Sequence, residues 1–323
     1  MQDVPRLDWL SYLLAHPDLV EAGLLTKKAA LDHYKRFGRE EGRSTDLLPK
    51  KEGVVVFSLS SGGCGLMNQL ISLASGMYIA HLLGRDFYCQ GFYPQYNDNS
   101  RILPLAEIVD VETTISCLRT RMTETEPKEG HSVNLASLLH DRKTFLSFLK
   151  TLYDRDWPVL YIGCPFFYNL DEKDDLVMHV LSLVSKLTFT KTFTDLALIY
   201  QPKQPYVSVH LRLEDDMLAF LKSLGLSPIQ YISKFRKVLS SLPEEVPIFV
   251  ASNLNKEKNV CNFVLQELQK THQVFTSQSL GRGREIDALV DYLICLGGVS
   301  FVGADQASTF SRVIFCSKTG IKV

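Results

Sequence analysis

The chain has 323 residues, of which 46% are hydrophobic and 22% charged, which is enough apolar material for a sizeable core and about two domains. Its formal net charge of −1 at pH 7 excludes a global basic footprint for nucleic acid. No stretch reaches the ~18 uninterrupted apolar residues that a membrane-spanning helix requires, so no transmembrane segment is predicted.

The first residues and the cysteines predict the compartment. Residues 1–6 lack the basic stretch and following apolar run of a signal peptide. The seven cysteines form no Cys-x-x-Cys pair, which argues against a zinc ribbon, and Cys295 sits inside an apolar run. We therefore expect a cytoplasmic protein in a reducing compartment.

Residues 1–46 predict a small helical unit. Apolar residues recur at helical spacing over 9–14 and again over 29–37. A helical hairpin packed on the main body and a separate docking module both fit this pattern. The polar segment 44–53 is predicted to link the unit to the rest of the chain.

Residues 53–200 predict a first α/β domain. The β-branched run 53–59 is typical of a strand buried on both faces of a parallel sheet, and an apolar helix face follows over 66–82. Further strands are expected at 86–89 and 158–162, with helices near 133–153 and 172–200.

A segment with two prolines, 201–205, marks the predicted boundary to a second α/β domain, 206–323. Its expected strands are 206–211, 247–252, 274–275 and 299–303, and its expected helices are 228–242, 256–271, 286–296 and 307–316. Strands that alternate with helices predict parallel sheets covered on both faces. In such sheets, ligands bind beyond the carboxyl ends of the strands.

A glycine-rich turn follows the first predicted strand. Gly62, Gly63 and Gly65 let the backbone turn sharply and approach a ligand, and the following helix N-terminus offers N–H groups to an anion. The segment is neither a Walker A loop nor a full dinucleotide fingerprint. Asn68 and Gln69 are polar residues at the start of an otherwise apolar helix, which favours a binding role over a plain tight turn.

The first strand of the second domain ends in a cluster of polar residues. His210 and Arg212 end a strand that should be buried, and the planar fork of Arg212 suits a diphosphate. Glu214 is a candidate general base. Asp215 and Asp216 are explained well as acids that meet a helix dipole.

Two further segments are candidates for phosphate binding. Ser308 and Thr309 lie near a predicted helix N-terminus, where Asp305 or Ser308 could equally be an ordinary N-cap. Arg284 lies in the basic loop 281–285, which either reaches a diphosphate or is simply solvated. No Asp-x-Asp motif lies at the carboxyl end of a predicted strand, where a divalent ion would be held, so chemistry without a metal is predicted.

The order of these segments resembles the fucosyltransferase superfamily, and most of all its protein O-fucosyltransferase and plant O-fucosyltransferase-like branch. Gly-Gly-x-Gly-x-x-Asn-Gln opens one α/β half, His-x-Arg opens the other, and Ser-Thr-Phe-Ser lies near the end. The run 210–217 is close to the branch's His-Leu-Arg-Phe-Glu-x-Asp-Met. This resemblance covers about 53–316, and 12–43 separately resembles short helical modules found beside glycosyltransferase domains.

The resemblance implies a GT-B architecture of two Rossmann-like domains with a cleft between them. It also implies inverting transfer of L-fucose from GDP-fucose to a glycan or protein hydroxyl, with no metal or cofactor. Glu214 is then the expected base, and Arg212 stabilises charge on the leaving diphosphate. The residues expected to bind the donor, from the resemblance and from the glycine-rich and basic loops, are Gly63, Gly65, Asn68, His210, Arg212, Arg284, Ser308, Thr309 and Phe310.

One departure from the family pattern keeps other donors open. The His-x-Arg-Arg-x-Asp version has a second arginine, and Leu213 stands in its place. Transfer of rhamnose, xylose or another sugar is therefore an alternative, and so is a non-catalytic protein that binds a nucleotide sugar or carbohydrate.

Overall fold

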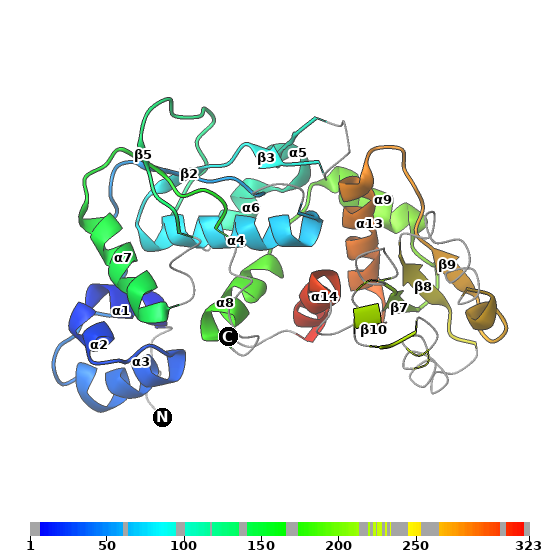
Figure 1. Ribbon diagram of the computed structural model, residues 1–323, viewed down its shortest axis with the longest axis horizontal. Helices are drawn as coiled ribbons and strands as arrows, with labels where there is room; N and C mark the ends of the chain where they lie inside the picture. Colours follow the sequence, from blue (N-terminus) through cyan, green and yellow to red (C-terminus); the bar gives the residue numbers. More distant parts are fainter. Residues whose placement is uncertain are drawn as a thin grey trace.

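The structure is a computed structural model in which two parallel β-sheets are surrounded by helices (Figure 1). The residues it describes are 7–60, 64–94, 101–116, 118–135, 141–165, 174–212, 219, 222–223, 225–227, 230, 233, 245–252, 265–303 and 308–319. Both sheets are parallel throughout, which confirms the prediction from alternating strands and helices.

The first sheet has the strand order β2-β1-β6-β5. Its strands are β1 (Val54–Val56), β2 (Asp86–Tyr88), β5 (His131–Ser132) and β6 (Val159–Tyr161). Val55 of the central strand β1 is fully buried, as expected for a strand with neighbours on both sides and helices on its faces. The strand β5 was not predicted, because two residues at a sheet edge carry too little pattern to be seen.

The second sheet has the strand order β10-β7-β8-β9. Its strands are β7 (Val207–His210), β8 (Ile248–Ala251), β9 (Val274–Thr276) and β10 (Ser300–Val302). Every residue of β7 and β8 is buried, because these are the two inner strands. All four predicted strands of this half are confirmed, three with slightly shorter bounds and β9 with one residue more.

Helix α4 (Leu66–Leu82) covers the first sheet and is buried almost all round. Every residue of α4 except Asn68 is buried. A helix that is apolar on all sides needs partners on all sides. Helix α4 therefore contacts β1 and β2 on one side and helices from later in the chain on the other.

The other helices of the first half follow the sequence expectations in part. These helices are α5 (Leu105–Ile108), α6 (Val111–Ile115), α7 (Arg142–Asp154), α8 (Asp175–Val184) and α9 (Lys191–Tyr200). A small antiparallel pair of strands, β3 (Gly91–Phe92) and β4 (Leu103–Pro104), precedes them. Helix α7 begins at residue 142, later than the predicted 133, because Asp141 caps it by accepting from the N–H groups of Lys143 and Thr144. The predicted stretch 172–200 is two helices.

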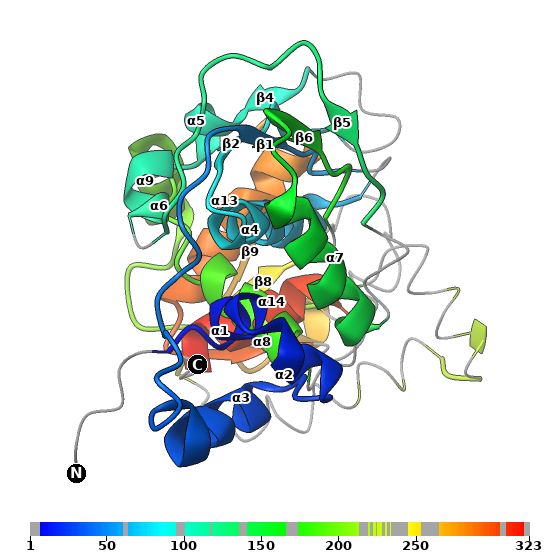
Figure 2. The ribbon, with the colours of Figure 1, turned by 90° about the vertical axis from the view of Figure 1, so that its left-hand side faces the viewer.

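The N-terminal helices pack against the first half. They are α1 (Trp9–Ala15), α2 (Pro17–Glu21), α3 (Lys27–His33) and the π-helical turn η1 (Tyr34–Gly38). Asp8 caps α1 and also accepts a hydrogen bond from the Tyr78 hydroxyl of α4 at 3.0 Å. The Arg142 guanidinium of α7 lies 5.6 Å from the Trp9 ring, so aromatic and charged contacts both fix this unit (Figure 2).

Two late helices connect the halves. Helix α13 (Arg284–Gly297) packs on α9 and on strands of the second sheet, and α14 (Thr309–Thr319) contacts α8 and α4 of the first half as well as α13 and β10. Figure 1 shows α14 between the two sheets. One continuous core of buried apolar residues therefore runs through both halves. Most of the predicted helix 228–242 and most of 256–271 lie outside the described residues.

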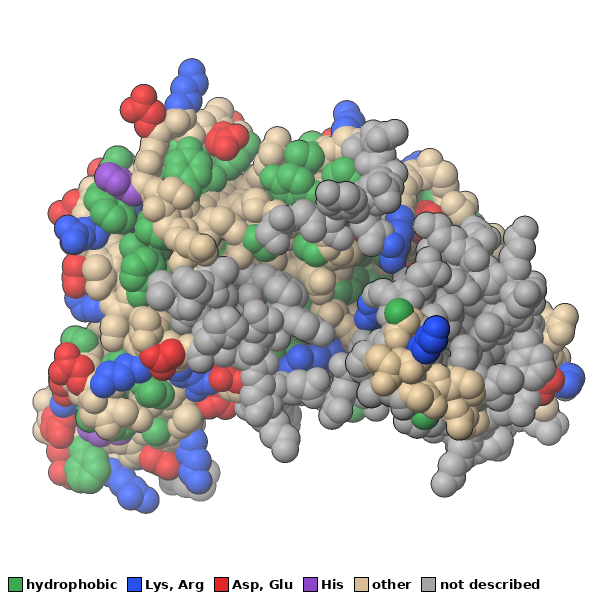
Figure 3. All heavy atoms as spheres, viewed as in Figure 1, with side chains coloured by type: hydrophobic (Ala, Val, Ile, Leu, Met, Phe, Trp, Pro, Cys, Tyr) green, Lys and Arg blue, Asp and Glu red, His purple; other side chains and the backbone are tan. Residues whose placement is uncertain are grey.

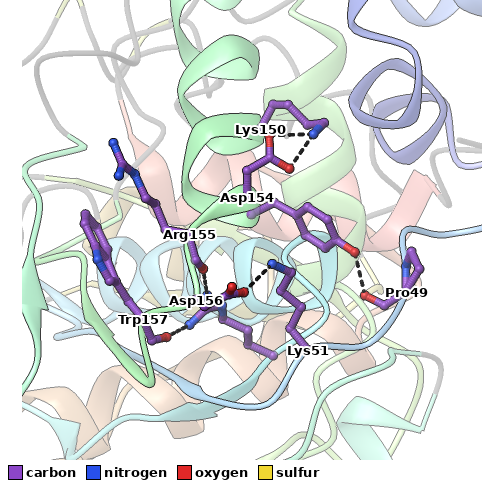
Figure 4. Close-up of polar contacts among 9 residues, drawn as sticks. Pro49, Lys51, Lys150, Asp154, Arg155, Asp156 and Trp157 are labelled. Carbon is purple, nitrogen blue, oxygen red and sulfur yellow. Dashed lines mark hydrogen bonds and ion pairs between the residues drawn. The ribbon is translucent and has the colours of Figure 1, made fainter.

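The amino ends of the first sheet are fixed by a buried arginine. Arg85 is 1% exposed, and it donates to the backbone carbonyls of Trp157 and of Arg155, the latter at 2.6 Å. Burial lowers the pKa of this guanidinium. Lys51 pairs with Asp156 at 2.9 Å at the same end of the sheet (Figure 4).

The described surface carries charges of both signs. Figure 3 shows acidic and basic side chains mixed over the N-terminal helices rather than separated into fields, in keeping with the net charge of −1. Within the described ranges, no helix has the length and apolar character needed to span a bilayer.

Candidate active site

The carboxyl end of β7 places His210 in a buried setting. Its side chain is 8% exposed, and its Nδ1 lies 2.8 Å from the Ser311 hydroxyl of α14. The Phe310 ring packs beside it, with 4.5 Å between ring centroids. The sequence prediction that His210 ends a buried strand is confirmed.

The electrostatic surroundings keep His210 neutral. Burial, and to a smaller extent the positive charge of Arg212, lowers the pKa of His210 to about 3. Arg212 follows two residues later and is half-exposed at the same sheet edge. A neutral imidazole carries one N–H and the neighbouring guanidinium is a permanent cation, so the pair suits an anionic ligand when that N–H faces it.

The start of α14 lies beside His210. Ser308 is 3% exposed, and its carbonyl accepts the Arg312 N–H at 3.0 Å, as the carbonyl of an N-cap residue does. Thr309 and Phe310 follow and are half-exposed. The N-cap interpretation of Ser308 thus fits the backbone, and Phe310 and Ser311 of the first turn place this helix start beside His210.

A half-buried carboxyl group at this edge was missed in the sequence. Asp291 on α13 accepts a hydrogen bond from the Ser277 hydroxyl at 2.6 Å, and the Ser252 N–H donates to the same hydroxyl at 3.2 Å. Burial, with a smaller contribution from Asp287, raises the pKa of Asp291 to about 7. Ser252 and Ser277 directly follow β8 and β9. The signal that the sequence offered for this residue was a carboxylate on the apolar face of the predicted helix 286–296.

The first half contributes the start of α4. Gly65 is the N-cap, and its carbonyl accepts the N–H groups of Asn68 at 3.0 Å and of Gln69 at 3.3 Å. A side chain at Gly65 would meet no described atom within 4 Å, so the described surroundings leave this position open. Asn68 is half-exposed next to it.

Gln69 has a structural role that differs from the sequence interpretation. Its side chain is fully buried, donates to the carbonyls of Cys64 and Tyr93, and accepts the Tyr93 N–H at 2.8 Å. These bonds tie the glycine-rich turn to the segment after β3. Polarity at this position therefore reflects backbone hydrogen bonding, because a buried amide must satisfy its donors and acceptor.

The glycine-rich turn lies near the start of α13. Burial raises the pKa of the Cys64 thiol, and the nearby Glu285 carboxylate adds to the rise. Glu285 is buried in the first turn of α13, next to the exposed Arg284 that begins this helix. Arg284 therefore lies on the side of the second half that faces the turn at Gly65.

The predicted site residues therefore form two described groups. One consists of His210, Arg212 and the start of α14, and the other of Gly65, Asn68 and, through α13, Arg284. Gly63 and Glu214 lie outside the described residues. Among the residues that the structure describes, no cluster of three His, Cys, Asp or Glu side chains is arranged to hold a metal ion.

Comparison with known proteins rests on structure. No family model matches the sequence, and no curated protein sequence matches it. The crystal structure of POFUT1 in complex with GDP-fucose matches with a TM-score of 0.58 and 15% identity over 82% of this chain and 94% of that one. Fucosyltransferase NodZ from Bradyrhizobium matches with a TM-score of 0.53 and 15% identity over 82% of this chain and 92% of that one.

This chain has the fold of these fucosyltransferases. The POFUT1 apo form gives the same result, with a TM-score of 0.60 and 15% identity over 85% of this chain and 97% of that one. The predicted GT-B architecture with two Rossmann-like halves is confirmed. The fucosyltransferase resemblance drawn from three short motifs is also confirmed at the level of fold.

Proposed function

We propose that the protein is an inverting, metal-independent glycosyltransferase that moves L-fucose from GDP-fucose to a hydroxyl of a glycan or protein. The observation that carries this proposal is the site at the carboxyl end of β7. There a neutral His210, Arg212 and the start of α14 lie together in the fold of POFUT1, which has been crystallised with GDP-fucose.

The arrangement suits a leaving nucleoside diphosphate. Negative charge grows on the diphosphate as the glycosidic bond breaks, and fixed donors stabilise that charge most. Arg212 supplies a bidentate cation, and the N-terminal turn of α14 supplies Thr309 and backbone N–H groups. Asp291, at the ends of β8 and β9, is suited to accept N–H donors of a nucleobase.

The acceptor hydroxyl must lose its proton in an inverting reaction. We assign this role to Glu214, which follows Arg212 by two positions in the sequence. Gly65 and Asn68 of the first half, together with Arg284 at the start of α13, would line the opposite side of the donor.

A nucleotide-sugar panel tests the proposal. Thermal shift and donor hydrolysis are measured with GDP-fucose, other GDP-sugars, UDP-sugars and dTDP-sugars. We expect the largest shift and the fastest hydrolysis with GDP-fucose. Stabilisation by UDP- or dTDP-sugars alone would contradict the proposed donor.

Replacing Arg212 tests the site itself. Arg212→Ala is expected to abolish transfer while the circular dichroism spectrum and the unfolding midpoint stay close to those of the wild type, because Arg212 is half-exposed. Near-normal turnover of this variant with every donor would show that the site is assigned wrongly.

Two alternatives have specific grounds. Leu213 stands where the His-x-Arg-Arg version has arginine, which favours testing rhamnose and xylose donors beside fucose. A non-catalytic binding protein would give a thermal shift with a nucleotide sugar but no product under any condition of the panel.

A further inference from the structure

Ser311 lies behind the proposed donor site rather than in it. Its side chain is fully buried on α14, and its hydroxyl lies 2.8 Å from Nδ1 of His210. The pairing joins residues 101 positions apart in the chain. It is also a direct side-chain contact between α14 and β7, the strand that ends at the proposed donor site.

The position of the Ser311 hydroxyl is set by close packing. A Cβ atom at Gly303 would lie 2.5 Å from this hydroxyl and 2.7 Å from the Phe301 ring, so a glycine is needed at that position. Helix α14 is held in turn by contacts with α8 and α4 of the first half and with α13 and β10 of the second. The hydroxyl thus has little freedom to leave Nδ1.

Because the imidazole of His210 is neutral, the direction of this hydrogen bond decides which ring nitrogen carries the proton. A neutral ring carries a single N–H, either on Nδ1 or on Nε2. If the serine accepts from Nδ1–H, then Nε2 is a bare acceptor and repels an anion. If the serine donates to Nδ1, then Nε2 carries the proton. No described residue hydrogen-bonds to Nε2, so that atom remains available to a ligand.

We propose that Ser311 is a positioning residue that donates its hydroxyl proton to Nδ1 of His210 and so presents Nε2–H to a diphosphate oxygen of the donor. The proposal rests on the proposed function for the identity of the anion. The pairing of the hydroxyl with the ring does not depend on that identity. Phe310 supports the same ring from a second direction, because its centroid lies 4.5 Å away.

Nitrogen NMR of the free protein tests the tautomer directly. Uniformly ¹⁵N-histidine-labelled wild type is compared with His210→Gln to assign the ring signals. We expect a protonated Nε2 and an unprotonated Nδ1 for His210 at pH 7.5. The reverse pattern, with the proton on Nδ1, would overturn the proposal.

Variants at position 311 test the consequence for binding. Ser311→Ala is expected to weaken GDP binding about tenfold and to leave the two tautomers mixed, because one hydrogen bond that orients the ring is lost. Ser311→Thr keeps a hydroxyl and is expected to recover most of the affinity. Ser317→Ala removes another hydroxyl of α14, one that lies 3.2 Å from the Tyr292 hydroxyl, and serves as the matched control for helix stability.

The outcomes separate this proposal from the proposed function. Unchanged GDP affinity and an unchanged His210 tautomer in Ser311→Ala would refute the role of Ser311. If Ser311→Ala and Ser317→Ala weaken GDP binding equally, the effect is one of helix stability and the positioning role is refuted. If the wild type binds no nucleotide, the proposed function fails and so does the role of Nε2 towards a diphosphate, while the NMR result still decides which partner of the Ser311–His210 pair is the donor.

Discussion

At the scale of single residues, two ionisable groups with opposite pKa shifts lie at one sheet edge. The pKa of His210 is lowered to about 3 and that of Asp291 is raised to about 7, both mainly by burial. The neutral form of each group is thus the one that the fold prefers. Such paired perturbations are common at functional sites, where an anionic ligand changes the balance.

The lowered pKa of His210 predicts a loss of stability in acid. In the unfolded chain this ring takes up a proton near its ordinary value of ~6.5, whereas the folded ring does not until about pH 3. The stabilisation is therefore present above pH 6.5 and is lost as the pH falls towards 3. Between pH 6.5 and 5 the loss amounts to about 2 kcal/mol in the free energy of unfolding.

Urea unfolding at pH 7 and pH 5 measures this loss as a difference between wild type and His210→Gln. Taking the difference removes the contribution of His179, whose pKa is lowered to about 4 by burial and which has the same sign. The same difference also removes the contribution of Asp291 to the pH dependence. An equal dependence on pH in both proteins would show that His210 is not the cause.

The raised pKa of Asp291 predicts the opposite dependence of stability on pH. Its folded pKa of about 7 exceeds the ordinary value, so its stabilising effect belongs to low pH and is lost as the pH rises through 7. Asp291→Asn should then raise the free energy of unfolding at pH 8 by roughly 1 kcal/mol and leave it unchanged or lower at pH 5. The same variant should weaken GDP binding. Asp195→Asn on α9, where the half-exposed carboxylate pairs with Lys191, is the control.

At the scale of secondary-structure elements, the start of α4 separates two polar neighbours. Gln69 is fully buried and bonded to the backbone on both sides, whereas Asn68 is the residue of α4 that is not buried. Gln69 therefore belongs to the framework, whereas Asn68 is accessible to the proposed donor.

This difference predicts opposite behaviour of two variants. Gln69→Leu should lower the free energy of unfolding by about 3 kcal/mol, because it leaves buried backbone groups of Cys64 and Tyr93 without partners. Asn68→Ala should change stability by less than about 0.5 kcal/mol and weaken donor binding. Chemical denaturation and GDP titration of both variants would check this, and similar stabilities would contradict it.

Elements with a strong local pattern could be predicted from the sequence. The apolar run of α4 and the strand that ends at His210 appear close to their expected bounds, and the β-branched run 53–59 contains the shorter strand β1. The order of three short motifs was enough to indicate the fold. Contacts between distant segments left no local pattern, so neither the pairing of Ser311 with His210 nor the bond between Asp291 and Ser277 could be predicted. For the same reason, Gln69 was interpreted as a binding residue.

At the scale of the whole molecule, the two sheets share one core. Buried residues of α14 include Val313 and Ile314, and the helix contacts elements of both halves. Both tryptophans, Trp9 and Trp157, lie on the side of the first sheet and the N-terminal helices. Their fluorescence therefore reports on the first half, whereas α14 belongs to the second half in the sequence.

This arrangement predicts joint unfolding of the two halves. Ile314→Ala should lower stability by about 3 kcal/mol and shift the tryptophan transition and the circular dichroism transition together. Phe315→Ala, at a neighbouring position that is 52% exposed, is the control and should shift neither by much. A tryptophan transition that stays in place in Ile314→Ala would show that the halves unfold independently.

The place of α14 in the chain also bears on how the protein is made. This helix completes the packing of α4 and α8, yet the ribosome must synthesise the whole second sheet before α14 emerges. The first half therefore exposes an apolar face of α4 for most of translation, and it cannot mature as an independent unit in the usual N-terminal-first order. Nascent chains stalled before α14 should be the species that chaperones bind most strongly.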